Sequence, residues 1–307
     1  MDPEIETPGI LVPLDGSPLA EQALPYAQAL LAPGAVLILL AVVEESEPIT
    51  GRWDSPLTAL DTMRSVREQQ AHDDLRRAEA TLRGEQPLAR LQVMRGDPAD
   101  QIVRAAAEQN VELIAMTTHG RGAIGRWIFG SVADRVARSA TVPVLSVRPS
   151  PDASPPVTIS RLVVPLDGSA LAEQALPMAQ ALAPRLGIPL HVITALDMMR
   201  LIPASFGPVV AFDAGVYQET LAHLESGATA MLAEVSERMA RAGVRSSSQI
   251  VQGSPFTAIA DALQAGDLIV MTSHGRGGVR RWSVGSVAEK LVREAPAPVI
   301  LVPVSTP

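Results

Sequence analysis

Apolar residues follow one another in short continuous runs, and segments with helical spacing separate these runs. In the first half of the chain, the apolar runs cover residues 9–15, 36–43, 89–96, 112–118 and 143–147. The helical segments cover residues 17–31, about 61–83, 98–110 and 131–140. Continuous apolar runs are typical of strands buried on both faces. The pattern predicts an α/β domain of the doubly wound (Rossmann-like) kind, with a five-stranded parallel sheet and helices on both faces.

The second half of the chain repeats the first. VPLDGSPLAEQALPYAQAL (Val12–Leu30) recurs as VPLDGSALAEQALPMAQAL (Val164–Leu182), and 17 of 19 positions are identical. The stretch THGRGAIGRWIFGSV (Thr118–Val132) recurs as SHGRGGVRRWSVGSV (Ser273–Val287). A length of 307 residues suits two domains. We therefore expect tandem domains over residues 1–150 and 161–307, joined by a linker rich in proline and serine over 151–160.

Composition narrows the range of partners. A net charge of −8 leaves no basic surplus to neutralise phosphates, so we expect neither nucleic acid nor an anionic membrane as a partner. The absence of cysteine excludes disulfides, thiolate nucleophiles and cysteine metal sites. The acidic N-terminus lacks the apolar core of a signal peptide, and the apolar stretch Ala35–Val43 is too short to cross a bilayer. These features favour a cytoplasmic location.

The repeated glycine loop lies where α/β proteins bind ligands, beyond the carboxyl end of a strand. Glycines such as Gly120 and Gly275 let the backbone approach a ligand closely. The pairs Gly130-Ser131 and Gly285-Ser286 open helices, whose first N–H groups and positive dipole ends favour an anion. This combination suits phosphate groups held by backbone donors. Two other phosphate motifs do not fit: no P-loop occurs, and GRGAIG follows the fourth predicted strand instead of the first.

A His-Gly pair, nine residues and then Gly-Ser, behind a strand that ends in Met-Thr, resembles the nucleotide loop of the universal stress protein family. ATP-binding members of that family carry G-x-x-G, nine residues and then G-[ST]. Here Thr117 and Thr272 stand where the first glycine belongs, and a β-branched residue is bulkier beside a phosphate. VPLDGS resembles the family's first strand, and the Gly-Asp-Pro sequence at 96–98 resembles its third-strand exit. The resemblance covers essentially the whole chain.

The resemblance implies one ATP per domain, with Mg²⁺ held by the phosphates. Asp15 and Asp167 would contact adenine or ribose, and the backbone of Val42 and Ala195 would lie beside the base. Gly120, Gly130, Ser131, Val132, Gly275, Gly285, Ser286 and Val287 would line the ribose and phosphates. The strand ends and the rest of the loops supply the other candidate residues: Pro13, Leu14, Met116, Thr117, His119, Arg121, Gly122, Pro165, Leu166, Met271, Thr272, His274, Arg276 and Gly277. A tandem chain also resembles a fused form of the family's homodimer. We therefore expect an intramolecular pseudo-dimer in which the two fifth strands pair, and a further homodimer stays open.

Several of these residues have alternative interpretations. Asp15 and Asp167 each precede Gly-Ser and could serve only the turn into the first helix. His119 and His274 have no carboxylate or hydroxyl fixed nearby in sequence, so a role in bracing the loop or beside the phosphates is favoured, and no catalytic residue is assigned. The five scattered histidines predict no metal site. The segment Met198–Gln218, which differs between the halves, is either a lid or contact surface, or a plug at the edge of the core.

The sequence therefore favours a regulatory, nucleotide-binding stress protein without efficient turnover. A slow ATPase or phosphotransfer enzyme is the first alternative, although no lysine clamp, metal-binding carboxylate or placed general base is evident. A module that binds a protein partner and no nucleotide is the second alternative.

Overall fold

The computed structural model describes residues 7–44, 57–82, 88–118, 130–149, 157–197, 214–273 and 285–304. The chain divides into two compact units, Met1–Val157 and Thr158–Pro307. Most of the predicted linker and most of the segment 198–218 lie outside the described residues.

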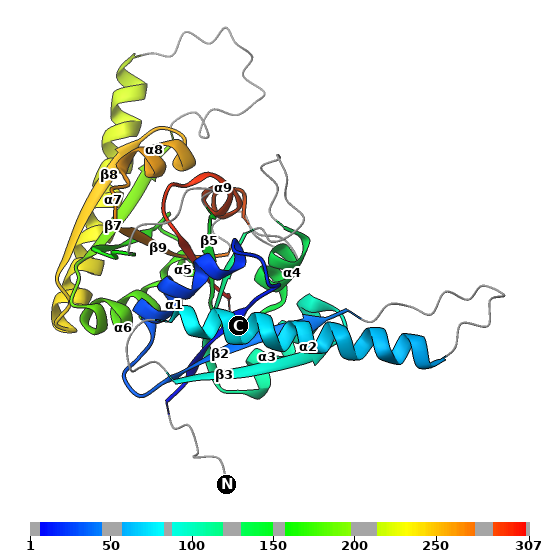
Figure 1. Cartoon of the computed structure of the whole chain (residues 1–307). Helices are drawn as coiled ribbons and strands as arrows, with labels where there is room; N and C mark the ends of the chain where they lie inside the picture. The colour runs from blue at the N-terminus through cyan, green and yellow to red at the C-terminus, as the bar shows by residue number, and fades with distance from the viewer. Residues whose placement is uncertain are drawn as a thin grey trace, which may run out of the picture. The chain divides into compact units, whose positions relative to one another are not determined.

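Unit 1 contains a five-stranded parallel sheet in the order β3-β2-β1-β4-β5. Its strands β2, β3 and β5 are labelled in Figure 1. Its strands are β1 Gly9–Pro13, β2 Val36–Val43, β3 Leu88–Arg95, β4 Val111–Thr117 and β5 Val144–Val147. Its helices are the 3-10 helix η1 Ala20–Ala23, α1 Leu24–Leu30, α2 Leu57–Thr81, α3 Pro98–Glu108 and α4 Ser131–Ser139. The predicted fold class and strand positions are confirmed.

Unit 2 has the same topology, with the parallel order β10-β9-β6-β7-β8. Its strands are β6 Arg161–Pro165, β7 Leu190–Leu196, β8 Ser246–Gln252, β9 Asp267–Thr272 and β10 Val299–Val302. Its helices are α5 Ala170–Glu173, α6 Leu176–Leu186, α7 Ala214–Arg241, α8 Pro255–Ala262 and α9 Ser286–Glu294.

Helices cover both faces of each sheet, which explains the continuous apolar strands. In unit 1, α3 and α4 pack on the face that carries Leu11, Leu40 and Ile114, and all three side chains are fully buried. Alternate residues, among them Ile10 and Leu39, point to the opposite face and are also fully buried. On that opposite face, α2 contacts β2 and β3, while η1 and α1 contact β4.

The first predicted helix is not continuous, which corrects one expectation from the sequence. Pro18 lies in a turn, and the chain forms η1 and then α1 instead of one helix from residue 17 to residue 31. Pro25 has no N–H to donate to the carbonyl one turn earlier, and the Leu24 N–H bonds to Glu21 in the tighter 3-10 pattern. Unit 2 breaks in the same way, with Pro177 in the first turn of α6.

Candidate functional site

The strand order places a topological switch point between β1 and β4. The chain leaves β1 toward β2 on one side and leaves β4 toward β5 on the other. The crevice beyond the carboxyl ends of two such strands is where open α/β sheets bind ligands. In unit 2 the same relation holds between β6 and β9.

The exit of the first strand has the same geometry in both units. The Leu14 N–H donates to the Leu40 carbonyl at 2.8 Å, and the Leu166 N–H donates to Ile193 at 2.8 Å. These bonds hold the carboxyl ends of β1 and β6 against their neighbours, just before Asp15 and Asp167. Pro13 and Pro165 are the last residues of the two strands.

The two aspartates shape the turn that follows. Asp15 Oδ1 accepts hydrogen bonds from the Ser17 N–H at 2.9 Å and from the Ser17 hydroxyl at 2.6 Å. Asp167 Oδ1 accepts the matching bonds from Ser169 at 3.0 and 2.6 Å. The turn role considered from the sequence is therefore real for one oxygen of each carboxylate. Contact of these aspartates with adenosine remains a prediction.

Each glycine loop leaves and rejoins the sheet at one point. The Gly130 N–H donates to the Thr118 carbonyl at 2.8 Å, and the Gly285 N–H donates to Ser273 at 2.7 Å. Since Thr118 directly follows β4, this bond fixes the start of α4 at the carboxyl edge of the sheet. The predicted loop residues between these anchors lie outside the described residues: His119, Gly120, Arg121, Gly122, His274, Gly275, Arg276 and Gly277.

The helix after each loop presents its amino end at this edge. Gly130 and Gly285 are the N-cap residues, and as glycines they have no side chain to cap α4 or α9. The first intrahelical bonds go from Asp134 to the Gly130 carbonyl and from Glu289 to the Gly285 carbonyl. The first N–H groups of a helix have no intrahelical acceptor, and with the helix dipole they favour an anion. Ser131 and Ser286 are exposed at this position, and Val132 packs partly against the core.

The remaining predicted residues lie at the ends of β2 and β4 and of their counterparts. Met116, Thr117, Met271 and Thr272 are buried within the strands, with at most 8% of the residue exposed. A β-branched threonine suits such a strand position. Val42 and Ala195 are half-buried and pair with Met94 and Val251 of the next strand.

A charged cluster beside the amino end of α4 was missed in the sequence. Arg135 lies one turn into α4 and pairs with Asp97 at 2.7 Å and with Asp100 at 2.9 Å. The Arg135 guanidinium lowers the pKa of the Asp97 carboxyl, and the hydrogen bond to Asp97 raises the pKa of Arg135. Asp97 also caps α3 by accepting the Asp100 N–H at 3.1 Å. The Gly-Asp-Pro sequence was the available signal, but Arg135 lies 38 residues from Asp97.

The corresponding position in unit 2 has different chemistry. Lys290 stands where unit 1 has Arg135, and its Nζ lies 5.9 Å from the centre of the Phe256 ring. Ser254 and Thr257 occupy the positions of Asp97 and Asp100. A cation–π contact therefore replaces the ion pairs.

The described part of the chain lacks both a metal-binding cluster and a membrane-spanning helix. It holds no group of three histidine or acidic side chains that could bind a metal ion. No helix among the described residues is long and apolar enough to span a membrane.

The geometry defines a tandem α/β protein whose two domains each present a loop-and-helix edge suited to an anion. The chain belongs to the universal stress protein family: the model of the Universal stress protein family matches residues 8–148 and again residues 158–303. The resemblance noted in the sequence is confirmed.

Relatives of similar size agree with this assignment. A universal stress protein of Mycobacterium tuberculosis is 30% identical over 190 residues, which cover 62% of this chain and 61% of the relative. The match thus spans about three fifths of that relative's length. A second universal stress protein of the same species is 26% identical over 302 residues and matches 95% of both chains. The crystal structure of a universal stress protein from Archaeoglobus fulgidus has a TM-score of 0.62 at 21% identity, with 96% of this chain and 98% of that chain covered, and it supports the fold.

Proposed function

We propose that this universal stress protein binds one ATP in each domain and acts as a cytoplasmic regulator in a stress response, without efficient turnover. Mg²⁺ would be held by the phosphates. Two family domains in one chain also fit an intramolecular counterpart of a homodimer.

One observation supports ATP binding above the others. In both units, the helix after the glycine loop begins at an uncapped glycine, which is hydrogen-bonded to the residue that follows β4 or β9 beside the switch point. Backbone N–H groups placed in this way suit phosphate oxygens. The first-strand aspartate and the end of β2 lie along the same carboxyl edge, where the nucleoside would bind.

The test is calorimetric titration of the full chain, stripped of nucleotide, with ATP and magnesium. We expect micromolar affinity, about −8 kcal/mol, and a stoichiometry near two. Ser131→Asp and Ser286→Asp place a negative charge in the first helical turn, where it stabilises the helix but repels phosphate. Each substitution should therefore remove one of the two sites without lowering the stability of the protein.

Ser139→Asp is the matched control, because it adds the same charge at the opposite end of α4, about 12 Å along the helix axis. It should leave both sites intact. Product analysis of the same samples tests the alternative of a slow ATPase. A folded chain that neither binds ATP nor gains thermal stability from it would refute the proposal and favour the partner-binding module.

A further inference from the structure

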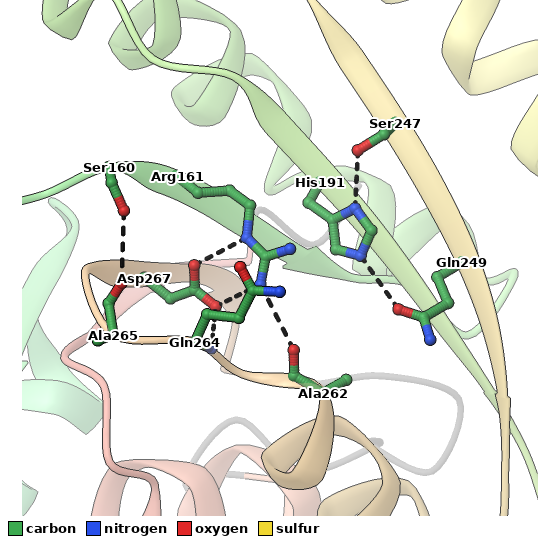
Figure 2. Close-up of polar contacts among 9 residues, drawn as sticks. All are labelled: Ser160, Arg161, His191, Ser247, Gln249, Ala262, Gln264, Ala265 and Asp267. Carbon is green, nitrogen blue, oxygen red and sulfur yellow. Dashed lines mark hydrogen bonds and ion pairs between the residues drawn. The ribbon is translucent and has the colours of Figure 1, made fainter.

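A polar cluster lies at the amino ends of the strands of unit 2, at the opposite end of the sheet from the proposed nucleotide site (Figure 2). His191 on β7 stands directly opposite Ser247 on β8, and its Nδ1 lies 2.8 Å from the Ser247 Oγ. Its Nε2 lies 3.4 Å from the Gln249 Oε1, two residues further along β8. The imidazole therefore lies between a hydroxyl and an amide.

The partners of the ring determine which nitrogen carries the proton. The tautomer with the proton on Nε2 satisfies both contacts, because the Gln249 Oε1 that faces this nitrogen only accepts hydrogen bonds. Nδ1 is then the acceptor, and the Ser247 hydroxyl donates to it. A serine that donates to a neutral imidazole, whose other nitrogen is held by a third group, is the arrangement of an activated nucleophile.

The surroundings keep the imidazole neutral. His191 is buried, with 8% exposed, and burial together with the nearby Arg161 lowers its pKa. Arg161 on β6 and Asp267 on β9 are the charged groups that act on the ring, and the Asp267 carboxylate opposes the effect of Arg161. The two charges pair through both carboxylate oxygens, at 2.8 and 2.6 Å.

The fold does not require this pair of side chains. Strand register equates His191 with Ile38 of unit 1, and Ser247 with Arg90. Unit 1 thus forms the same sheet with an isoleucine at the buried position. Burying a polar histidine costs free energy, and serine is a poor strand former, so the unit 2 pair needs another explanation.

Access to the hydroxyl is open. Among the described strands, β8 pairs with β7 alone and forms the outer strand of its sheet. Ser247 is exposed, while the imidazole behind it is buried.

We propose that Ser247 is a covalent modification site, acylated by small activated esters or thioesters with His191 as the general base. The Ser247 Oγ attacks the acyl carbonyl carbon and forms an ester bond. The bond from that carbon to the leaving oxygen or sulfur breaks, and the electron pair leaves with that atom. The Ser247 proton passes to His191 Nδ1 and then to the leaving group or to water.

The test uses p-nitrophenyl acetate on the full chain, with acetylation located and timed by peptide mass spectrometry. Ser248 is the internal control, because it is the adjacent exposed serine and points to the opposite face of β8. We expect Ser247 to be acetylated about a hundredfold faster than Ser248, the range that general-base catalysis supplies. His191→Ile, which installs the unit 1 residue, should reduce the Ser247 rate to that of Ser248.

Circular dichroism and unfolding of the variant establish that it folds. Gln249→Leu is a second test that keeps His191. It removes the group that holds the tautomer of the imidazole, so we expect a Ser247 acetylation rate between those of the native protein and His191→Ile. Equal acetylation of Ser247 and Ser248 in the native protein would overturn the proposal. A folded His191→Ile protein that keeps the fast Ser247 rate would overturn it too.

Discussion

The ion pair between Arg161 and Asp267 predicts a large loss of stability in unit 2 when only one partner is removed. Arg161 is the first residue of β6, the central strand of this sheet, and Asp267 is the first residue of the neighbouring strand β9. Figure 2 shows the pair. The Asp267 side chain is 1% exposed and the Arg161 side chain 17%. Asp267 also accepts the Gln264 N–H at 2.8 Å, and Arg161 contacts the Ala262 carbonyl at the end of α8 at 3.4 Å. The pair therefore joins two strands and the end of a helix.

The size of the expected stability loss follows from the burial of the ion pair. Arg161→Met keeps most of the aliphatic length but leaves a buried carboxylate without its counter-charge, which costs about 3–5 kcal/mol. In the double variant, Arg161→Met with Asp267→Asn, no charge remains buried, and the side-chain amide oxygen introduced at position 267 can still accept the Gln264 N–H. We therefore expect the double variant to be more stable than the single variant, with most of the loss recovered.

The assay is urea unfolding of the full chain together with hydrogen exchange. A loss of about 3 kcal/mol corresponds to about a hundredfold faster exchange in the unit 2 strands. The strands of unit 1 serve as the internal reference. Arg76→Met is the matched control, because it breaks an exposed pair with Asp73 at 3.6 Å and should cost under about 0.5 kcal/mol. A cost below about 1 kcal/mol for Arg161→Met, or a double variant no better than the single one, would refute the reasoning.

Two further predictions concern pH and backbone conformation. The pKa of His191 is lowered in the folded protein, so the unfolded chain takes up a proton first as pH falls below about 6.5, and stability should decline there. In His191→Ile the loss of stability caused by protonation of His191 should vanish, which urea unfolding at several pH values measures. A stability profile with the same pH dependence as the native protein would contradict the lowered pKa of His191. Gly96→Ala should cost about 1–3 kcal/mol, because φ is +126°, a backbone conformation that residues with a Cβ rarely adopt. Gly227→Ala is the control, since this helical glycine has nothing within 4 Å of an added Cβ and the change should stabilise by up to about 1 kcal/mol; similar unfolding midpoints for the two variants would sink the prediction.

Local signals explain how much of the fold the sequence predicts. The run predicted at residues 36–43 forms β2 over the same residues, because a strand buried on both faces must be apolar throughout. The helix predicted at 98–110 is found at 98–108, where Asp97 caps it and Pro98 starts it. These signals act over a few residues, so sequence alone carries them. The break before Pro25 was missed because a proline in the first turn of one helix and a proline inside a longer helix look alike in the sequence.

Contacts between residues far apart in the sequence limit how much of the site can be predicted. The pattern of apolar residues located the strand ends and helix starts. The ion pair between Arg161 and Asp267, however, joins residues that lie 106 positions apart. The Arg135 contact with Asp97 likewise depends on how α4 lies beside α3. No spacing rule in one sequence encodes such pairs. The turn role of Asp15 was foreseen only as an alternative, because a carboxylate at a strand end suits both a turn and a ligand.

The charges around the two helix starts lead to a last prediction, which depends on the proposed ATP sites. In unit 1, Asp97 and Asp100 with Arg135 give two negative charges and one positive, a net −1, close to the start of α4. In unit 2, the corresponding positions hold Ser254, Thr257 and Lys290, a net +1. The two helix starts thus share their backbone geometry but differ by two charges at these three positions.

A charge close to the start of α4 or α9 changes the binding energy of a phosphate bound there. Arg135 and Lys290 lie four residues into their helices, about 6 Å along the axis from the first residue. At about 10 Å in water, each pair of unit charges interacts by about 0.4 kcal/mol before salt screening. A difference of two charges acting on MgATP then amounts to about 1 kcal/mol, or about fivefold in Kd. We therefore expect the unit 2 site to bind ATP more tightly.

The single-site variants separate the two affinities. Ser131→Asp leaves the unit 2 site, and Ser286→Asp leaves the unit 1 site, so each can be titrated alone at about 50 and 200 mM salt, where screening weakens the contribution of distant charges. The affinity gap should narrow at the higher salt, because its cause is electrostatic. Replacing Asp97 and Asp100 by the unit 2 residues serine and threonine should bring the unit 1 affinity to the unit 2 value. Equal affinities at low salt, or a gap that salt leaves unchanged, would show that the flanking charges do not control binding.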